Sequence, residues 1–359
     1  MTDRSDDVFV LIIAGGRGTR FWPWSRRGLP KQCLSVNGET TLIRATVDRV
    51  LPIVPAERVL VVTSAEMAEP LRAELGMLPP ENLLVEPEGR NTAPAVGWGV
   101  LEVGHRSHGR NAVMIVLPSD HLIREEDELR DLLLDCAEAA RATNALVTIG
   151  LVPTRAETGY GYLEVGGALG SFGDRPFLRV SRFVEKPDAD LAAQYVAGGE
   201  HLWNAGMFVF TVEAMRDAYR QHLPRTWTAL EQLRAHPERL VELYNKMDRT
   251  SIDYGVMERH SHVLTVRGEL GWSDVGSWEA LADILPPVSG GVGRAALVVS
   301  HDAQQNVVYA PGQTVALLGV EGLVVVQVGD VLMVCPRERA QDVRALTVAL
   351  EQLGETRLL

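Results

Sequence analysis

The stretch that decides the fold is VFVLIIAGGRGTRFWPWSRRGLPKQ, from Val8 to Gln32. Its first residues, Val8 to Ala14, form a short apolar run rich in Val and Ile, which is typical of a strand buried on both faces of a parallel sheet. Gly15, Gly16 and Gly18 come next, and their backbone N–H groups carry no side chain that would keep a phosphate away. The stretch therefore predicts a strand that runs into an anion-binding loop.

A block of cationic residues follows these glycines, with no acidic residue before Glu39. It consists of Arg17, Arg20, Arg26, Arg27 and Lys31. The whole chain is acidic, with a net charge of −12 from 35 Lys and Arg against 47 Asp and Glu. A cationic block in an acidic chain indicates a local site for a polyanion and argues against general binding of nucleic acid or anionic membranes. We therefore expect neither nucleic acid nor membrane as a partner.

Two common glycine loops do not fit this stretch. A dinucleotide-binding fingerprint needs a third glycine where Phe21 stands, and a P-loop needs Gly-Lys-Ser/Thr, which is absent. The simple alternative is a tight turn with a solvated basic face. The longer string GGRGTRFWPWSR, followed by PKQ, resembles the signature of the sugar-nucleotide pyrophosphorylases, and its FWPxSR and PKQ forms are similar to the mannose-1-phosphate guanylyltransferase branch.

This resemblance assigns roles to the residues of the loop. It implies that the catalytic residues are Arg20 and Lys31. It also implies that the nucleotide is bound by Ala14, Gly15, Gly16, Gly18 and Thr19.

Length and composition describe an ordinary globular enzyme. The chain has 359 residues, enough for one large and one small domain, with 46% hydrophobic and 23% charged residues. Cys33, Cys136 and Cys335 are far apart and form no CxxC pair, so neither a disulfide framework nor a zinc site is indicated. The acidic N-terminus is not a secretory signal, and no apolar run approaches the ~20 residues of a membrane helix. We expect a soluble, cytoplasmic protein.

Apolar runs of strand length alternate with helical patterns through the first part of the chain. Strand patterns fall at 8–14, 58–63, 83–85, 112–117 and 147–151, and helical patterns at 41–50 and 125–142. This alternation predicts parallel strands with ligands beyond their carboxyl ends. The resemblance implies an α/β fold, with a Rossmann-like nucleotidyltransferase (GT-A-like) mixed sheet that has helices on both faces.

The segment EPEGRNTAPA follows the strand pattern at 83–85. From the residues alone it is a polar loop with a helix cap at Asn91 or Thr92, and Pro94 suits the first turn of the next helix. The N-terminus of that helix would then face the ligand. The segment resembles the part of the guanylyltransferases around the nucleotide base. This implies that guanine and ribose are bound by Glu86, Arg90, Asn91 and Thr92.

The string LPSDH places Asp120 at the carboxyl end of a predicted strand. Magnesium prefers carboxylate and phosphate oxygens and usually takes one or two protein carboxylates, although an aspartate after a strand is more often a helix cap. A lone histidine such as His121 favours a structural role. In the family that the string resembles, the equivalent aspartate binds the metal and a second one lies in WSDVG. This implies an Mg²⁺ site at Asp120 and Asp274, with Ser119 at the nucleotide.

Three later stretches mix glycine, aromatic and single polar residues, as a pocket for a polyhydroxyl ligand requires. They are TGYGYLEV at 158–165, RFVEKP at 182–187 and WNAGMFVF at 203–210. Taken singly they are a β-hairpin, an edge strand stopped by proline, and ordinary core. In this order they resemble the sugar-phosphate half of the same family. This implies that the sugar phosphate is bound by Gly159, Glu185, Lys186, Asn204 and, in the string SIDYGVME, Asp253.

The last part of the chain differs in pattern. PPVSGGVG at 286–293 is typical of a linker, short apolar runs separated by Asn or Gly follow it, and a helical pattern covers 339–353. This predicts a small all-β module similar to a few coils of a β-helix, capped by that helix. We expect a catalytic domain at 1–285 and, at 286–359, a C-terminal module like a short left-handed β-helix.

The resemblance implies an enzyme that makes GDP-mannose and diphosphate from GTP and mannose 1-phosphate, with Mg²⁺ as cofactor. Apolar rows in the C-terminal module indicate packing against a partner subunit, so we expect a homodimer. Alternatives are another sugar 1-phosphate, such as glucose or a heptose, a regulatory paralogue without turnover, and a bifunctional enzyme with isomerase activity. The paralogue is disfavoured by the presence of the predicted cationic and metal-binding residues, and the isomerase by the absence of clustered histidines in the tail.

Overall fold

The computed structural model describes residues 4–16, 18–36 and 38–359, so Arg17 of the cationic block lies outside the described residues. The chain forms two compact units built from segments that are distant in the sequence. The large unit comprises the chain up to Gly15, Thr46–Ser119 and Ile123–Gly271. The small unit comprises Gly16–Ala45, Asp120–Leu122 and Trp272–Leu359. Most of the glycine loop therefore belongs to the same unit as the C-terminal module.

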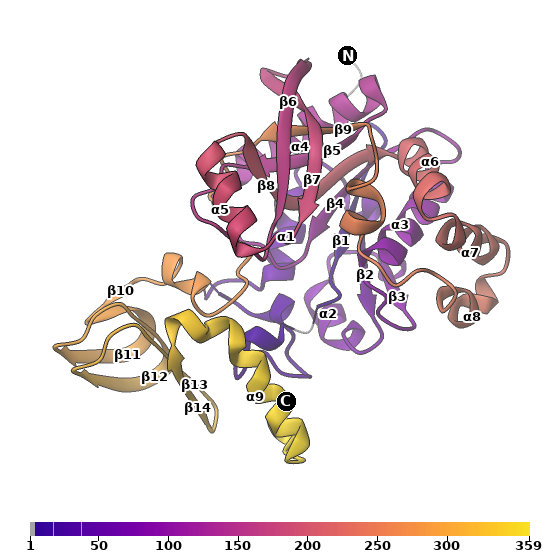
Figure 1. The fold of residues 1–359 in the computed structure, drawn as a ribbon. Coiled ribbons are helices and arrows are strands. Elements are labelled where there is room, and N and C mark those ends of the chain that lie inside the picture. Colours follow the sequence, from indigo (N-terminus) through magenta and orange to yellow (C-terminus); the bar gives the residue numbers. More distant parts are fainter. Residues whose placement is uncertain (1–3, 17, 37) are drawn as a thin grey trace. The chain divides into compact units, whose positions relative to one another are not determined.

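Within the described residues, the large unit is built on a nine-stranded sheet with the order β3-β2-β1-β4-β8-β5-β9-β7-β6 (Figure 1). Its strands are β1 (Val8–Ile13), β2 (Val59–Ser64), β3 (Leu83–Glu86), β4 (Val113–Pro118), β5 (Leu146–Leu151), β6 (Gly161–Phe172), β7 (Arg175–Glu185), β8 (His201–Thr211) and β9 (Val263–Arg267). The strands β3, β2, β1 and β4 are parallel. The strand β8 runs antiparallel between β4 and β5, so the sheet is mixed, as predicted.

The central strands are buried on both faces, which explains their unbroken apolar runs. Phe9 and Leu11 of β1 lie in the main hydrophobic core of the unit, and Val10 and Ile12, on the opposite face, are also fully buried. The helices are α1 (Leu42–Val50), where the chain passes from the small to the large unit, α2 (Ala68–Glu74), α3 (Thr92–Arg106), α4 (Glu126–Thr143), α5 (Ala189–Gly198), α6 (Val212–His222), α7 (Pro224–Ala235) and α8 (Leu240–Tyr244). The predicted α/β class is confirmed.

Within the described residues, the small unit holds a five-stranded sheet with the order β10-β11-β12-β13-β14. Its elements are β10 (Pro287–Val288), β11 (Gly291–His301), β12 (Asn306–Leu318), β13 (Leu323–Val328), β14 (Val331–Pro336) and the helix α9 (Arg344–Gln352). The strands β11, β12 and β13 are parallel, as successive coils of a β-helix are. The predicted β module with a terminal helix is therefore present.

The segment predicted as a linker is instead an ordered turn between β10 and β11. A Cβ atom on Gly291 would lie 1.9 Å from the carbonyl oxygen of Asn306, and one on Gly293 would lie 2.3 Å from that of Val308. These glycines are required because β11 passes close to β12, and they do not indicate flexibility. The domain boundary at residue 286 remains a proposal.

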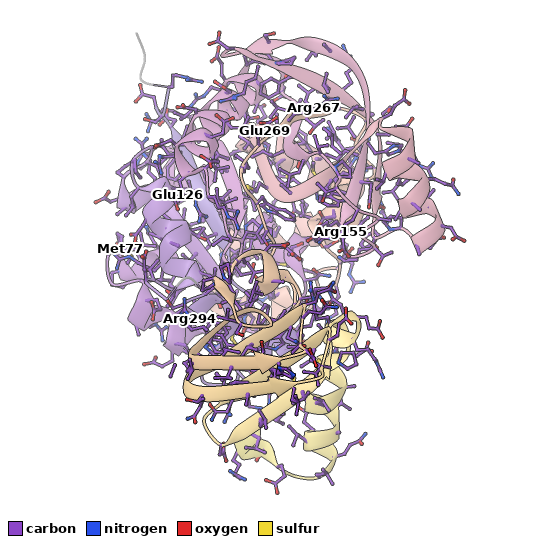
Figure 2. All side chains as sticks on the ribbon, turned by 90° about the vertical axis from the view of Figure 1, so that its left-hand side faces the viewer. Met77, Glu126, Arg155, Arg267, Glu269 and Arg294 are labelled. Carbon is purple, nitrogen blue, oxygen red and sulfur yellow. The ribbon has the colours of Figure 1, made fainter. Side chains whose placement is uncertain are left out.

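The FWPW string packs into the hydrophobic core of the small unit. Trp24 stacks on Tyr309 of β12 with ring centroids 4.2 Å apart, and Phe21 lies 5.4 Å from Trp278. The Trp278 indole donates a hydrogen bond of 3.0 Å to the carbonyl of Trp22. From β11, Arg294 donates at 3.4 Å to the carbonyl of Val36. Figure 2 labels Arg294 among the side chains. The aromatic half of the signature is therefore structural.

Candidate functional site

The loop glycines serve two different purposes. Gly15 and Gly16 are exposed, and a Cβ atom on Gly16 would meet nothing within 4 Å. Gly18 has a φ of +65°, and a Cβ atom there would lie 2.3 Å from the Cβ of Lys31. Gly15 and Gly16 thus leave backbone open to an anion, whereas Gly18 allows the close approach of Lys31. Buried Ala14 continues the sheet, since its N–H donates to Val62 at 2.9 Å.

Lys31 joins the two predicted metal-binding residues. Its ammonium donates to Oδ2 of Asp120 at 2.8 Å and to the backbone carbonyl of Asp274 at 2.7 Å. Burial acts to raise the pKa of the Asp120 carboxyl, but the charges of Lys31 and His121 outweigh it, so this pKa lies below its ordinary value. Asp120 is therefore ionised at neutral pH, as a metal ligand must be.

The WSDVG string has a constrained backbone. Val275 is fully buried at a φ of +46°, which is unusual for a β-branched residue and is a form of strain associated with functional sites. Asp274 forms an Asx-turn, because its Oδ1 accepts a hydrogen bond from the N–H of Gly276 at 3.1 Å. A carboxylate has about four acceptor positions, so this turn is compatible with a metal contact.

The surroundings of Asp120 and Asp274 agree with the predicted role of His121 but do not show a cluster of metal-binding side chains. The Trp272 indole donates to Nδ1 of His121 at 3.1 Å, which fits a structural role for that histidine. Within residues 4–16, 18–36 and 38–359, no three His, Cys, Asp or Glu side chains gather as a metal cluster. Two aspartates that contact one ammonium are nevertheless a suitable donor set for Mg²⁺, which takes its other ligands from water and phosphate.

The cationic block divides into two parts. Arg20 is exposed, whereas Arg26 donates to the carbonyls of Pro23 and Val328, at 3.1 and 3.2 Å. Arg27 pairs with Glu351 at 3.5 Å. Arg26 and Arg27 therefore hold the C-terminal module, and the prediction of one continuous polyanion site was too broad.

The segment predicted to bind the base lies in the large unit and begins at the end of β3. Glu86 is only 4% exposed, and its Oε1 accepts a hydrogen bond from the hydroxyl of Tyr244. Burial raises the pKa of Glu86, and the hydrogen bond from Tyr244 offsets this only in part. Arg90 donates from Nε to the carbonyl of Met247 at 3.2 Å, so it positions the loop.

The N-terminus of α3 is not an anion site at its first three positions. The N–H of Thr92 is taken by the side chain of Asn91 at 2.8 Å, and that of Ala93 by the carbonyl of Thr250 at 3.1 Å. Pro94 has no N–H. These positions therefore offer no unbonded N–H to an anion, and the predicted cap at Asn91 is present. Ser119 is buried, and its N–H donates to Ile13 at 3.1 Å.

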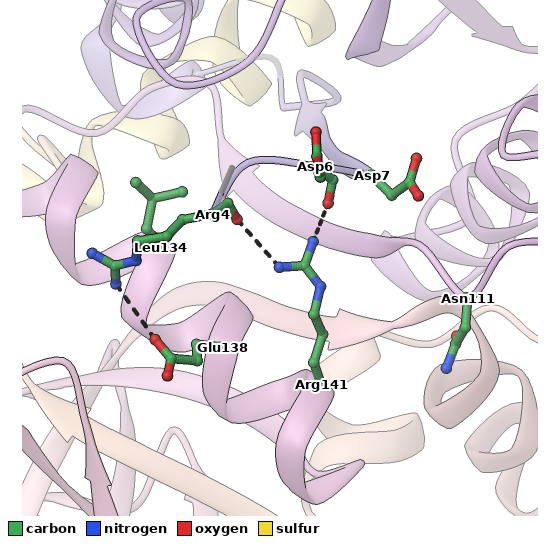
Figure 3. Close-up of a pocket in the computed structure, with 7 residues that line it drawn as sticks. All are labelled: Arg4, Asp6, Asp7, Asn111, Leu134, Glu138 and Arg141. Carbon is green, nitrogen blue, oxygen red and sulfur yellow. Dashed lines mark hydrogen bonds and ion pairs between the residues drawn. The ribbon is translucent and has the colours of Figure 1, made fainter. Parts of the chain in front are cut away.

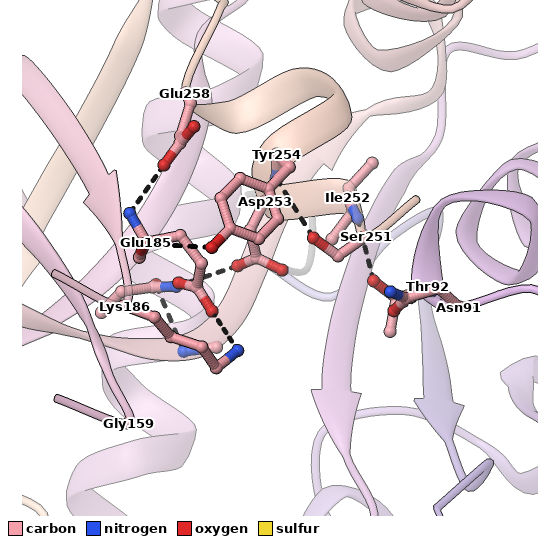
Figure 4. A network of polar contacts seen from close by, with 12 residues as sticks. Asn91, Thr92, Gly159, Glu185, Lys186, Ser251, Ile252, Asp253, Tyr254 and Glu258 are labelled. Carbon is pink, nitrogen blue, oxygen red and sulfur yellow. Dashed lines mark hydrogen bonds and ion pairs between the residues drawn. The ribbon is translucent and has the colours of Figure 1, made fainter. Parts of the chain in front are cut away.

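A second polar network in the large unit contains the predicted sugar-phosphate residues (Figure 4). Lys186 bonds Oε1 of Glu185 at 2.6 Å, and burial, which lowers its pKa, is outweighed by Glu185, so the pKa of Lys186 is raised. Lys186 also has a φ of +51°, another strained backbone at a candidate site. The Glu185 side chain is only 9% exposed.

Asn204 connects this network to the core of the sheet. Its Nδ2 donates to Oδ1 of Asp253 at 3.2 Å, and its Oδ1 accepts from the Thr148 hydroxyl at 2.8 Å. Burial first, and then the nearby charge of Glu185, raise the pKa of Asp253. The structure thus brings Glu185, Lys186, Asn204 and Asp253 together, while Gly159 lies in an exposed turn.

Sequence reasoning missed three residues of these networks. Tyr244 holds Glu86, the hydroxyl of Tyr254 donates to the carbonyl of Glu185 at 3.2 Å, and Glu258 accepts from the Glu185 N–H at 2.6 Å. Tyr254 and Glu258 lie in the SIDYGVME string that was already singled out. Tyr244 lies in no motif, so only the fold reveals it.

A separate hollow near the N-terminus is not part of these networks (Figure 3). It is lined by Arg4, Asp6, Asp7, Asn111, Leu134, Glu138 and Arg141. The Arg141 guanidinium donates to the carbonyls of Arg4, at 3.2 Å, and of Asp6, so it ties down the backbone before β1. We therefore interpret the polar side chains around this hollow as a means of holding the N-terminal segment in place.

The nucleotidyl transferase family matches residues 9–289 of the chain. The chain belongs to the nucleotidyl transferase family. A second match, to the mannose-phosphate isomerase/GMP-like β-helix domain, covers residues 297–350 of this nucleotidyl transferase. In the described part of the chain, no helix is long and apolar enough to cross a membrane.

Named relatives resemble the nucleotidyl transferase over nearly its full length. The xanthan biosynthesis protein XanB of Xanthomonas campestris pv. campestris (strain B100) is 36% identical over 98% of this chain and 74% of its own. Mannose-1-phosphate guanylyltransferase of Escherichia coli (strain K12) is 35% identical over 97% of this chain and 74% of its own. The chain thus spans about three quarters of each relative.

A solved structure is similar throughout. The crystal structure described as "mannose-1-phosphate geranyltransferase" from Thermus thermophilus has a TM-score of 0.86 and 38% identity, and covers 96% of this chain and 99% of that one. Both units of the nucleotidyl transferase, each taken as a fold, therefore have counterparts in one known protein.

Proposed function

We propose that the protein is a mannose-1-phosphate guanylyltransferase, which converts GTP and mannose 1-phosphate into GDP-mannose and diphosphate. The observation that carries this proposal is the arrangement around Lys31, whose ammonium contacts Asp120 and Asp274 directly behind an open glycine loop. Relatives that bear this name match nearly the whole chain.

The reaction requires no nucleophile from the protein. An oxygen of the sugar phosphate, already ionised at neutral pH, attacks the α-phosphorus of GTP in line. The new phosphorus–oxygen bond forms as the bond to the β-phosphate breaks, and diphosphate leaves with the electron pair. The protein must position these anions and stabilise developing charge, for which we assign Arg20 and Lys31.

We assign Mg²⁺ to Asp120 and Asp274, whose hard oxygen donors suit it. When bound, it would neutralise charge on the nucleotide phosphates. Lys31 favours the ionised form of Asp120 and fixes the backbone carbonyl of Asp274, which supports the assignment of a cation beside these two residues.

We place nucleotide recognition on the glycine loop and the Glu86–Thr92 segment, and sugar-phosphate recognition on the network of Glu185, Lys186, Asn204 and Asp253. Epimers such as mannose and glucose 1-phosphate differ in the direction of one hydroxyl, so phosphate contacts from Lys186 do not separate them. Buried hydrogen-bonding groups do, because a misplaced hydroxyl leaves them unpaired, at ~1–3 kcal/mol each.

We also propose a cytoplasmic homodimer formed through the C-terminal module. Leu297 and Val299 on β11 are 53% and 52% exposed, and Leu318 on β12 is 74% exposed. An exposed apolar row of this kind favours contact with a second copy. A monomer in light scattering at micromolar concentration would contradict the dimer.

The test is diphosphate release measured over a matrix of nucleoside triphosphates and sugar 1-phosphates. We expect GTP with mannose 1-phosphate to be preferred, by roughly 10- to 100-fold in kcat/KM over glucose 1-phosphate. Glu185→Gln should reduce the preference for mannose 1-phosphate over glucose 1-phosphate more than Lys186→Met does. Equal use of glucose 1-phosphate would contradict the assignment of mannose. The absence of diphosphate release from every pair of substrates would contradict the proposed reaction.

A further inference from the structure

Tyr244, the last residue of α8, and the residues that follow it hold the predicted base-binding segment in place within the large unit. The contacts between them include Tyr244 to Glu86, Met247 to Arg90, Arg249 to Glu88, and Thr250 to Ala93. The last three of these fix backbone atoms or side chains that are less buried than Glu86. The contact of Tyr244 is different, because it fixes the one nearly fully buried carboxylate of the segment.

Tyr244 is itself rigidly placed. It is fully buried at the end of α8, and its ring packs edge-on against Trp98 with centroids 5.9 Å apart. Burial strongly raises the pKa of its hydroxyl, so the hydroxyl keeps its proton at neutral pH and donates it to Oε1 of Glu86. This contact decides which carboxylate oxygen remains for a ligand.

The other oxygen lies toward Gly15 of the same unit. A Cβ atom on Gly15 would be 4.0 Å from Oε2 of Glu86, and Gly15 has no side chain to fill that space. Guanine carries two N–H donor groups on its Watson–Crick edge, the ring N1–H and the 2-amino group. Adenine instead carries an unprotonated ring nitrogen there, whose lone pair a carboxylate repels.

We propose that Tyr244 is a specificity-determining positioning residue, whose hydroxyl orients the Glu86 carboxylate so that Oε2 reads the N–H donors of guanine. The inference rests on the proposed function and deepens it, because it assigns the preference for guanine over adenine to the hydrogen bond between Tyr244 and Glu86. Tyr244 does not touch the nucleotide; it acts through Glu86.

The experiment compares Tyr244→Phe with Tyr219→Phe. Both tyrosines are fully buried in the same core. Tyr219→Phe also removes one hydrogen bond, but that bond goes to the carbonyl of Ala93 and not to Glu86. For Tyr244→Phe we expect the GTP KM to rise about 10-fold and the GTP-to-ATP ratio of kcat/KM to fall about 10-fold, with kcat for GTP within about threefold of wild type. Tyr219→Phe should keep the wild-type ratio.

Equilibrium binding of GTP and ATP, without sugar phosphate, gives a second readout that does not need turnover. If the wild type binds GTP in preference to ATP but releases no diphosphate, the proposed reaction fails while the role of Tyr244 is still tested. An unchanged GTP-to-ATP ratio in Tyr244→Phe, or an equal fall in Tyr219→Phe, would overturn the inference. So would an unchanged preference in Glu86→Gln, which keeps the size of the side chain.

Discussion

Glu86 is a carboxyl group that the fold holds almost entirely out of water, with the hydroxyl of Tyr244 as a hydrogen-bond donor. Its burial favours the protonated form, and the Tyr244 hydrogen bond favours the ionised form less strongly, so its pKa is raised above the ordinary value of 4.5. A base-reading carboxylate must be ionised to accept hydrogen bonds from guanine. Function and stability therefore make opposite demands on this residue.

The first prediction concerns Glu86→Gln. Between the unfolded and folded pKa values the folded protein binds more protons than the unfolded chain, so the unfolding free energy falls as pH rises through the folded pKa. At pH 7.5 we expect Glu86→Gln to melt at a higher temperature than the wild type while binding GTP less tightly. The gain in melting temperature over the wild type should vanish at pH 4. Thermal melts across this range test it, with the exposed Glu69→Gln as a control that shows no such trend.

The second prediction concerns Lys31. Its removal leaves Asp120 without its ammonium partner and releases the carbonyl of Asp274, so we expect Lys31→Ala to lose roughly 100- to 1,000-fold in turnover. Arg27→Ala removes a cation from the same block, but one that pairs with Glu351 on the terminal helix, and it should stay within a few-fold of wild type. Steady-state rates of both purified variants decide the matter; similar rates would refute the role of Lys31.

At this scale the sequence singles out residues that lie in recognisable strings and does not single out those that make contacts distant in the sequence. Lys31, Asp120 and Asp274 were predicted from PKQ, LPSDH and WSDVG, and the fold brings them to one ammonium. Tyr244 was not predicted, because the partner that gives it meaning, Glu86, is 158 residues away.

At the scale of elements, the glycine loop combines an open backbone with a close contact. Gly16→Ala meets no neighbouring atom, whereas Gly18→Ala forces a Cβ into that of Lys31 at a positive φ. We expect Gly18→Ala to lower the melting temperature and displace Lys31, and Gly16→Ala to leave stability nearly unchanged. Differential scanning calorimetry of the two variants provides the test, and equal melting temperatures would contradict the distinction.

Apolar runs predicted the parallel strands closely, but they did not fix the direction of β8. WNAGMFVF is buried on both faces of the sheet, so it has no alternation that would reveal how it pairs. Likewise, glycines in PPVSGGVG indicated a linker because flexible and tightly packed segments both select glycine. The close approach of Gly291 to Asn306 and of Gly293 to Val308 shows that these glycines lie in a tightly packed segment and not in a flexible linker.

At the scale of the whole molecule, the compact units do not follow chain order. The segment that carries Lys31 shares a hydrophobic core with the C-terminal strands, including Tyr309, Val324 and Val326. The module thus supports the segment that carries Lys31 directly, a role that the sequence, which indicated assembly, did not reveal.

The last prediction is that truncation after Pro286 abolishes turnover even if the large unit remains folded. Loss of β11 to β14 uncovers Trp24 and the rest of that core, at ~25 cal/mol per Å² of apolar surface exposed. Far-UV circular dichroism would report the surviving sheet and the diphosphate assay the lost activity. A truncated chain with wild-type kcat would refute the dependence.

The indoles beside the glycine loop have an optical consequence. Trp24 and Trp278 stack with centroids 6.0 Å apart, Tyr309 lies 4.2 Å from Trp24, and the Trp22 indole is bonded to the carbonyl of Leu358 at 2.7 Å. Aromatic chromophores held this closely couple their electronic transitions, which gives the small unit a near-ultraviolet dichroic band of its own. The glycine loop is therefore flanked by a label-free probe, and a change in this band during GTP titration would report binding in the unmodified protein.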